Sequence, residues 1–325
     1  MLKKIVYSAL AVLLFAHCAL VQAQQARIPK IGWLAVRPAS AAFMIESFQR
    51  EFSKLGYSHG KNVVFEFRYA EGKLDRLPAL AEELIRLKVD VLIAPNTLAA
   101  KALTNATKTI PIVFLDVTDP IGSGLVDSLA RPGGNITGFT LIESVLAGKR
   151  LELLKETIPK LSRVAVVWNP WEQSSAHSWK ESQLPARELG LQLYSMEISS
   201  PDKFESEFKK AVQAGSGALA WITSSLEISG DQTAAVLTRK YRLPAIHTRR
   251  SAVERGALMS YGADRDESFR RTAVFVDKIL KGTKPADIPV EQPMAFELAI
   301  NLKTAKALGL TIPPIVLMRA TRVVK

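Results

Sequence analysis

Residues 110–138, IPIVFLDVTDPIGSGLVDSLARPGGNITG, decide the fold of this chain of 325 residues. They begin with a short apolar run, Ile110 to Leu115, of the kind that a parallel sheet buries on both faces. Asp116 and Asp119 follow it, among prolines and glycines that interrupt regular structure. Because ligands of open α/β sheets bind outside the carboxyl ends of strands, the stretch predicts a strand that delivers polar side chains to a cleft. The alternative is a long surface loop with solvated acids.

Apolar strands and amphipathic helices alternate on both sides of this stretch. The expected strands are residues 31–35, 63–67, 89–94, 110–115, 164–168, 191–196, 218–222 and 243–248. Such alternation is typical of the α/β class, in which helices cover both faces of a mainly parallel sheet.

The pattern repeats at an offset of about 130 residues, the size of one small domain. A first strand, a Leu-Gly helix end and a proline-containing strand recur in the same order. The matching pairs are Ile31 and Val164, Leu55-Gly56 and Leu189-Gly190, and residues 110–113 and 243–246. The repeat predicts two Rossmann-like, doubly wound lobes that face each other across a cleft.

The last part of the chain has no counterpart in the repeat. A strand is expected at residues 257–261, followed by a helix that begins at Asp264 with Glu267 completing a capping box. We expect this tail to return to both lobes and to add crossings to a multi-crossover hinge. Lobe 1 would then be residues 28–140 with about 263–288, and lobe 2 residues 141–262 with about 289–325.

Residues 1–23 have the features of a secretory signal peptide. Lys3 and Lys4 precede an apolar run, and a small-x-Ala cleavage site ends at Ala23. An uncleaved membrane anchor is the alternative reading. Lipid attachment at Cys18 is disfavoured, because a lipobox requires a small residue where His17 stands.

Cys18 is the single cysteine of the chain. A chain that begins at Gln24 therefore has no thiol for catalysis, for a metal site or for a disulfide. A cysteine-free exported protein of this size suits the bacterial periplasm, where stray thiols become oxidised.

The formal net charge is +12, and removing Lys3 and Lys4 leaves +10 because the first 23 residues contain no acid. The basic residues are spread along the chain, and no run of Lys and Arg exceeds two. No helix-turn-helix, RNA-binding or zinc-finger pattern is present. The charge therefore indicates a solvated surface and no nucleic-acid partner.

The sequence contains no recognisable catalytic or cofactor motif. His59, His177 and His247 lie far apart and lack metal-ligand spacing. Gly122-Ser123-Gly124 begins like a dinucleotide fingerprint, but Asp127 occupies the position of the third glycine. Walker A and G-x-S-x-G patterns are absent. We therefore expect no enzyme, no cofactor and no metal, and ligand binding is the better use of the acids after residue 115.

A set of polar and aromatic residues follows the expected strands of both halves, and we predict that they line the cleft. They are Arg37, Ser40, Asn96, Thr97, Asp116, Asp119, Asn169, Trp171, Ser224, Ser225, Thr248, Arg249 and Tyr261. Each has an ordinary alternative: Ser40 and Thr97 as helix N-caps, for example, or Asn169 as a turn residue.

The residue types in this set suit an amino acid or another small carboxylate. Arg37 or Arg249 can pair with a carboxylate, and Asp116 or Asp119 with an ammonium group. Trp171 or Tyr261 can stack on an apolar body.

Four segments carry a family resemblance: VTDPIGSGLVDSLARPGGNITG at 117–138, GALMSYGAD at 256–264, VDKILKGTKPADIPVEQP at 276–293 and FELAINLKTAKALGLTIPP at 296–314. With them the chain resembles the periplasmic substrate-binding proteins of ABC transporters, in the family that includes tryptophan- and tyrosine-type binding proteins. The resemblance implies a type I periplasmic binding fold, no catalysis, and delivery of a solute to an inner-membrane permease. We also expect a monomer. Thr97 and Asp119 lie in segments that line the cleft in that family.

The resemblance is weaker at the positions where the second lobe is expected to line the cleft. The segments after Trp168 and at residues 222–228 are idiosyncratic, and residues 247–250, His-Thr-Arg-Arg, are unusually basic. Aromatic amino acid specificity is therefore not assumed. A ligand-sensing periplasmic module for a membrane receptor and a secreted enzyme remain as alternatives to transport.

Overall fold

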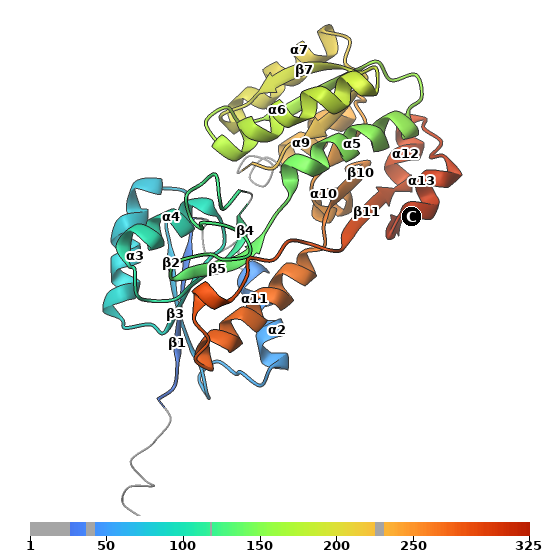
Figure 1. The fold of residues 1–325 in the computed structure, drawn as a ribbon. Helices are drawn as coiled ribbons and strands as arrows, with labels where there is room; N and C mark the ends of the chain where they lie inside the picture. Colours follow the sequence, from blue (N-terminus) through green and yellow to red (C-terminus); the bar gives the residue numbers. More distant parts are fainter. Residues whose placement is uncertain (1–26, 37–42, 118, 225–230) are drawn as a thin grey trace, which may run out of the picture.

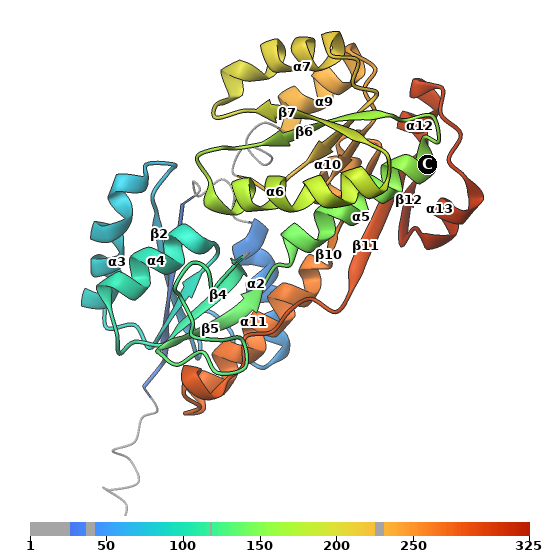
Figure 2. The same cartoon turned by 45° about the horizontal axis from the view of Figure 1, so that its top comes forward.

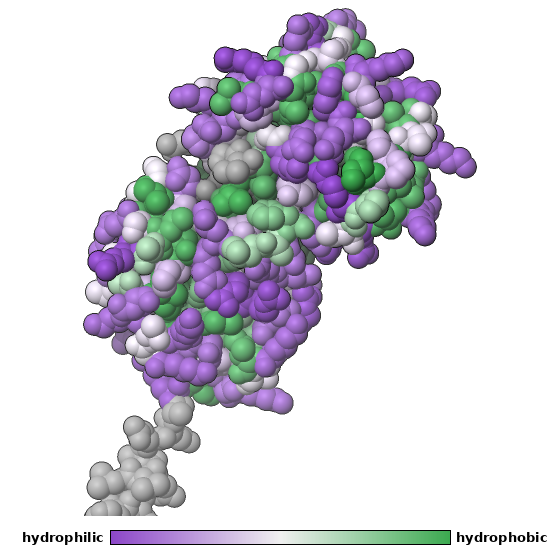
Figure 3. Space-filling view, turned by 45° about the vertical axis from the view of Figure 1, so that its right-hand side comes forward, coloured by the Kyte–Doolittle hydropathy of each residue, from purple (hydrophilic) through white to green (hydrophobic). Residues whose placement is uncertain are grey.

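The computed structural model describes residues 27–36, 43–117, 119–224 and 231–325, which form two lobes (Figure 1). The expected signal peptide lies outside these residues. Among the helices that they form, none is long and apolar enough to cross a membrane. Figure 3 shows hydrophilic residues over most of one face of both lobes, and the outline narrows between them.

The described part of lobe 1 contains a five-stranded sheet whose neighbouring strands all run parallel. Its strands, in spatial order, are β2 (Val64–Tyr69), β1 (Lys30–Ala35), β3 (Val91–Ala94), β4 (Ile112–Val117) and β5 (Ile136–Thr140). One apolar core packs the sheet against α2 (Phe43–Lys54) and α11 (Arg265–Leu280). A second core packs the other face against α3 (Leu77–Arg86) and α4 (Thr97–Ala106). Burial on both faces explains why β1, β3 and β4 are apolar runs.

Lobe 2 is built around a seven-stranded sheet, counted over the residues described. Its strands, in spatial order, are β12 (Arg322–Val324), β11 (Phe296–Asn301), β10 (Met259–Ala263), β9 (Ala245–His247), β8 (Ala218–Trp221), β6 (Arg163–Trp168) and β7 (Gln192–Glu197). The β10–β11 pair is antiparallel, and the other pairs are parallel.

Helices cover both faces of the second sheet as well (Figure 2). One core includes α5 (Glu143–Thr157), α6 (Gln173–Glu188), α12 (Leu302–Leu308) and α13 (Pro314–Arg319), and the opposite core includes α7 (Phe204–Gln213) and α9 (Asp231–Lys240). The short helix α10 (Arg250–Glu254) follows β9 directly. Short 3-10 turns complete the chain at η2 (Leu74–Arg76), η3 (Pro201–Lys203) and η4 (Pro285–Asp287).

The chain passes between the lobes after β5, between β10 and α11, and before β11 (Figure 1). These crossings are bonded to one another. The backbone N–H of Thr140 donates to Glu291 O at 2.9 Å, and that of Asp264 donates to Ala295 O at 3.0 Å. The Glu267 carboxylate accepts from the backbone N–H groups of Met294 at 3.3 Å and Ala295 at 3.2 Å. The hinge is therefore a small hydrogen-bonded ribbon.

Several local predictions need correction. Residues 136–140 form β5, a strand that was not among those expected from the sequence, and β4 extends through Asp116 to Val117. Glu267 does not complete a capping box with Asp264, because the Asp264 N–H already donates to Ala295. The Asp264 carboxylate caps α11 by accepting from the N–H of Asp266 at 2.9 Å. The α/β class and the two doubly wound lobes are confirmed.

Candidate ligand-binding site

A cavity of about 2140 Å³ lies between the lobes and is lined by residues of both. The segments that follow β1, β3 and β4 border it from lobe 1, and those that follow β6, β8 and β9 border it from lobe 2. Small-molecule sites typically occupy about 300–1000 Å³. The cavity is therefore larger than one small ligand would fill.

Most of the described residues that the sequence predicted for the cleft do line this cavity. They are Asn96, Thr97, Asp116, Asp119, Asn169, Trp171, Ser224 and Arg249. Thr248 and Tyr261 are not among the lining residues: Thr248 is buried, and the Tyr261 ring packs on Phe296, with centroids 6.1 Å apart. Arg37, Ser40 and Ser225 lie outside the described residues.

Asn96 fixes the lobe 1 loop that follows β3. Its side-chain Oδ1 accepts from the N–H of Ala99 at 2.9 Å, so Asn96 is the N-cap of α4 and Thr97 is the first residue of the helix. The interpretation of Thr97 as the cap was therefore wrong by one residue. The cap holds the N-terminal end of α4, with its partial positive charge, at the cavity wall.

Asp119 shapes the next loop. Its Oδ1 accepts from the N–H of Gly122 at 2.8 Å, which closes a turn directly after β4. A Cβ on Gly122 would clash with the Asp119 carboxylate, so a larger residue there would push the carboxylate out of this hydrogen bond. Asp119 is exposed, and part of its hydrogen-bonding capacity holds the loop.

Asp116 differs from Asp119 in conformation and burial. Its φ is +59°, in the left-handed region, and the register between β4 and β5 shifts around it. Such an irregularity redirects a side chain out of the strand's alternation. The Asp116 side chain is only 8% exposed, and Oδ2 forms an ion pair with Arg265. The other oxygen, Oδ1, is buried and has no hydrogen-bond partner among the residues that the structure describes.

Arg265, the first residue of α11, is a site residue that the sequence did not reveal. It lies at a hinge crossing and lines the cavity, with its guanidinium carbon 5.9 Å from the centroid of the Phe269 ring. Its partner Asp116 precedes it by 149 positions. One feature of the sequence could have pointed to Arg265. A helix was expected to begin at Asp264, just after a strand, and residues that follow strands were expected to line the cleft.

The lobe 2 loop after β6 is held by Asn169, which is buried. Its Oδ1 accepts from the N–H of Trp171 at 3.1 Å, and its Nδ2 donates to Glu172 Oε1 at 2.9 Å. Asn169 is thus the turn residue that its alternative reading predicted. The turn presents Trp171 at the cavity with 84% of its surface exposed. An exposed indole at a cavity wall can cover a ligand when the lobes approach.

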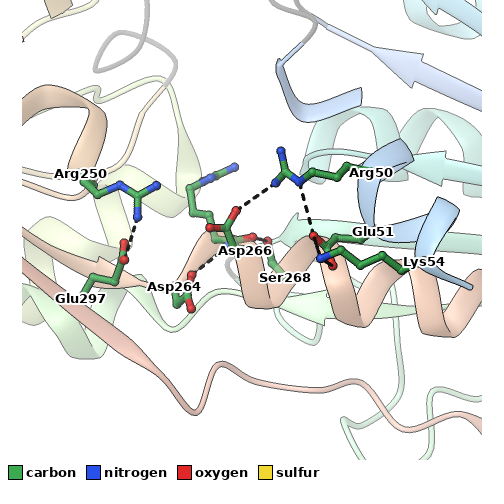
Figure 4. A network of polar contacts seen from close by, with 9 residues as sticks. Arg50, Glu51, Lys54, Arg250, Asp264, Asp266, Ser268 and Glu297 are labelled. Carbon is green, nitrogen blue, oxygen red and sulfur yellow. Dashed lines mark hydrogen bonds and ion pairs between the residues drawn. The ribbon is translucent and has the colours of Figure 1, made fainter. Parts of the chain in front are cut away.

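Charged residues near the hinge form a polar network (Figure 4). Arg250 donates to Glu297 Oε1 at 2.9 Å in lobe 2, and Arg50 of α2 lies 3.5 Å from Asp266 Oδ1 in lobe 1. Burial raises the pKa of the Glu297 carboxyl, nearby Asp264 and Asp266 raise it further, and Arg250 opposes the shift. The sequence predicted none of these contacts.

The two walls of the cavity carry opposite charge. Among the described lining residues, lobe 1 and the start of α11 contribute more acids than bases: Glu71, Asp116, Asp119, Asp264 and Asp266 against Lys101 and Arg265. Lobe 2 contributes more bases: Lys180, Arg239, Arg249, Arg250 and Arg255 against Glu172, Glu254 and Glu297. Across the described parts of the chain, no three His, Cys, Asp or Glu residues are placed to hold a metal ion.

Comparison with known proteins identifies the family. The sequence pattern of the family described as ABC transporter substrate binding protein matches residues 36–324. A tyrosine-binding protein of Clostridioides difficile is 29% identical over 268 residues, which are 82% of this chain and 76% of the relative.

Two solved structures have similar folds. A conserved domain protein from Vibrio cholerae is 30% identical, with a TM-score of 0.85 over 91% of this chain and 100% of its own. An ABC domain from Streptococcus pneumonia in complex with L-Trp is 28% identical, with a TM-score of 0.83 over 91% of this chain and 99% of its own. The chain has the type I periplasmic binding fold, and it belongs to the family of ABC transporter substrate-binding proteins.

Proposed function

We propose that this protein binds a small solute, an amino acid or an organic carboxylate, between its lobes and delivers it to the permease of an ABC importer. The cavity between the lobes carries this proposal, because both walls and the hinge contribute polar residues to it. The relatives that bind tyrosine and L-Trp favour an amino acid. The basic and apolar features of residues 1–23 favour export to the periplasm and removal of that segment.

Delivery requires that the solute changes the shape of the protein. A ligand that contacts both walls in a closed state, and one wall in an open state, shifts the population toward closure. The excess volume of the cavity over a typical small-molecule site gives room for this movement.

The test is a thermal-shift screen of residues 24–325 with amino acids, aromatic carboxylates and small organic acids. A ligand at about 100 times its Kd adds roughly 2.7 kcal/mol to the free energy of unfolding. We expect one chemical class to raise Tm and to reduce the radius of gyration in solution scattering. Mass spectrometry of the denatured protein checks for a trapped solute. Absence of both a shift and a trapped solute, or turnover of the bound compound, would contradict the proposal.

A further inference from the structure

We propose that Asp116 recognises an ammonium group of the solute and that Arg265 holds the Asp116 carboxylate in position for this contact. The inference deepens the proposed function and rests on it. It selects solutes that carry a protonated amine, among the amino acids and carboxylates that the cavity could accept.

The burial of Asp116 supports this role. Its carboxylate lines the cavity, is 8% exposed, and uses Oδ2 for the ion pair with Arg265. Oδ1 is buried, and the described part of the chain offers it no hydrogen-bond partner. A buried, unpaired acceptor on a charged group is unfavourable until a donor reaches it, so a solute that brings an N–H group gains a strong, charge-assisted hydrogen bond.

The backbone of Asp116 points to the same conclusion. A non-glycine residue with a φ of +59° inside a strand is rare, and such conformations cluster at ligand sites. The register shift between β4 and β5 accompanies it. The positive φ and the register shift together interrupt the regular pairing of β4 with β5 and turn the Asp116 carboxylate toward the cavity wall.

Asp119 is the obvious competitor, and the geometry disfavours it. Asp119 is exposed, and its Oδ1 already accepts from the N–H of Gly122. Water competes for an exposed carboxylate, so an ammonium group gains less there than at Asp116. Asp119 is therefore the matched control for Asp116, since both acids line the same cavity only three positions apart.

Arg265 acts through Asp116 as a positioning residue. Its guanidinium keeps the buried carboxylate paired through one oxygen and leaves the second oxygen for the solute. The basic excess on the lobe 2 lining suits an anionic group at the other end of the solute. An α-amino acid would then lie across the cavity, with its ammonium toward lobe 1 and its carboxylate toward lobe 2.

The experiment compares the twenty L-amino acids with their N-acetyl derivatives and their amides, using thermal shift and then calorimetry on residues 24–325. With the wild-type protein, the best amino acid should bind at least 100-fold more tightly than its N-acetyl derivative. Asp116→Asn should weaken that amino acid at least 50-fold and remove most of this discrimination. Asp119→Asn should weaken it less than 5-fold. Asparagine is chosen because it tolerates the left-handed backbone.

Two controls accompany the test. Circular dichroism and Tm establish that each variant is folded. Arg265→Lys should retain most of the affinity that Arg265→Met loses, because a cation is restored beside Asp116; equal loss in both variants would overturn the positioning role. Affinity within 3-fold of wild type in folded Asp116→Asn, or tight binding of the N-acetyl derivative, would overturn the role of Asp116.

Failure of the proposed function has a different signature. If only carboxylates without an amine bind, the protein remains a solute-binding protein while the inference about Asp116 is overturned. If no compound of either class binds and no solute is trapped, both are overturned.

Discussion

The two walls of the cavity differ in how firmly their side chains are held. On the lobe 1 wall, Asn96 caps a helix, Asp119 closes a turn, and Asp116 is buried against Arg265. On the lobe 2 wall, Trp171 is 84% exposed, and the Arg250–Glu297 ion pair is partly open to solvent. The difference indicates that Asp116 is held in position before a solute arrives, whereas the Trp171 side chain is open to form contacts when the lobes close.

The largest expected difference between the walls is in how much their ion pairs contribute to the free energy of unfolding. Arg265→Ala should lower the free energy of unfolding by about 2–4 kcal/mol, because it leaves a buried carboxylate without its partner. Arg250→Ala should cost less than about 1 kcal/mol, because its pair with Glu297 is more exposed. Urea denaturation of both variants without ligand measures the difference. Equal losses would show that the two walls are held alike.

A second test concerns the packing of lobe 1 away from the cavity, at Tyr57. Burial raises the pKa of Tyr57 to about 12, and the hydrogen bond from its hydroxyl to Asp277 of α11 adds to the shift. Since the folded pKa lies above the unfolded value of about 10, the stabilisation is complete below pH 10 and is lost as the pH rises through 12.

We therefore expect the stability advantage of wild type over Tyr57→Phe to fall between pH 9 and pH 12, by on the order of 1–3 kcal/mol. Denaturation curves of both proteins at stepped pH give this difference. A constant difference across the range would mean that Tyr57 titrates normally in the folded protein.

A smaller effect is expected on the lobe 2 wall. Trp171→Ala should weaken binding of the best solute about 10-fold, which corresponds to about 1.4 kcal/mol, and should leave Tm of the unliganded protein unchanged. Leu184→Ala is the control, because Leu184 is an exposed apolar residue of α6 outside the cavity lining. Calorimetry on both variants checks the prediction. A loss of Tm in Trp171→Ala would indicate that the indole already packs in the open state.

The smallest effect concerns the turn after β4. Asp119→Ala should lower the free energy of unfolding by about 0.5–1.5 kcal/mol, because the N–H of Gly122 loses its acceptor. Asp119→Asn should retain most of that stability through its amide oxygen. Thermal denaturation separates the two variants. Identical stabilities would show that the turn does not depend on this hydrogen bond.

Periodicity alone was enough to predict much of the fold. Buried strands such as β1 and β6 are apolar on both faces, and this pattern is readable without the structure. β5 was missed because Ile136–Thr140 contains a glycine and follows a segment full of turn residues. Its strand character comes from pairing with β4, which is a tertiary effect that local propensity does not record.

The cleft residues were predictable to the extent that they follow strands. Asn96, Asn169 and Ser224 come directly after buried runs, and the topology of parallel sheets brings such positions together. Arg265 was not predictable, because its role depends on the hinge returning α11 to lobe 1 beside Asp116. The burial of Asp116 and the exposure of Asp119 cannot be read from the sequence, in which both acids follow the same apolar run, residues 110–115.

The bonds between the hinge crossings have a consequence for measuring this protein. Because Thr140, Asp264 and Glu267 tie the crossings to Glu291, Met294 and Ala295, the lobes should rotate about one common axis. One distance between the lobes then describes the whole movement. The chain from Gln24 onward contains no cysteine, so two introduced thiols carrying fluorescent dyes, one per lobe, would turn the protein into an optical sensor of its own solute.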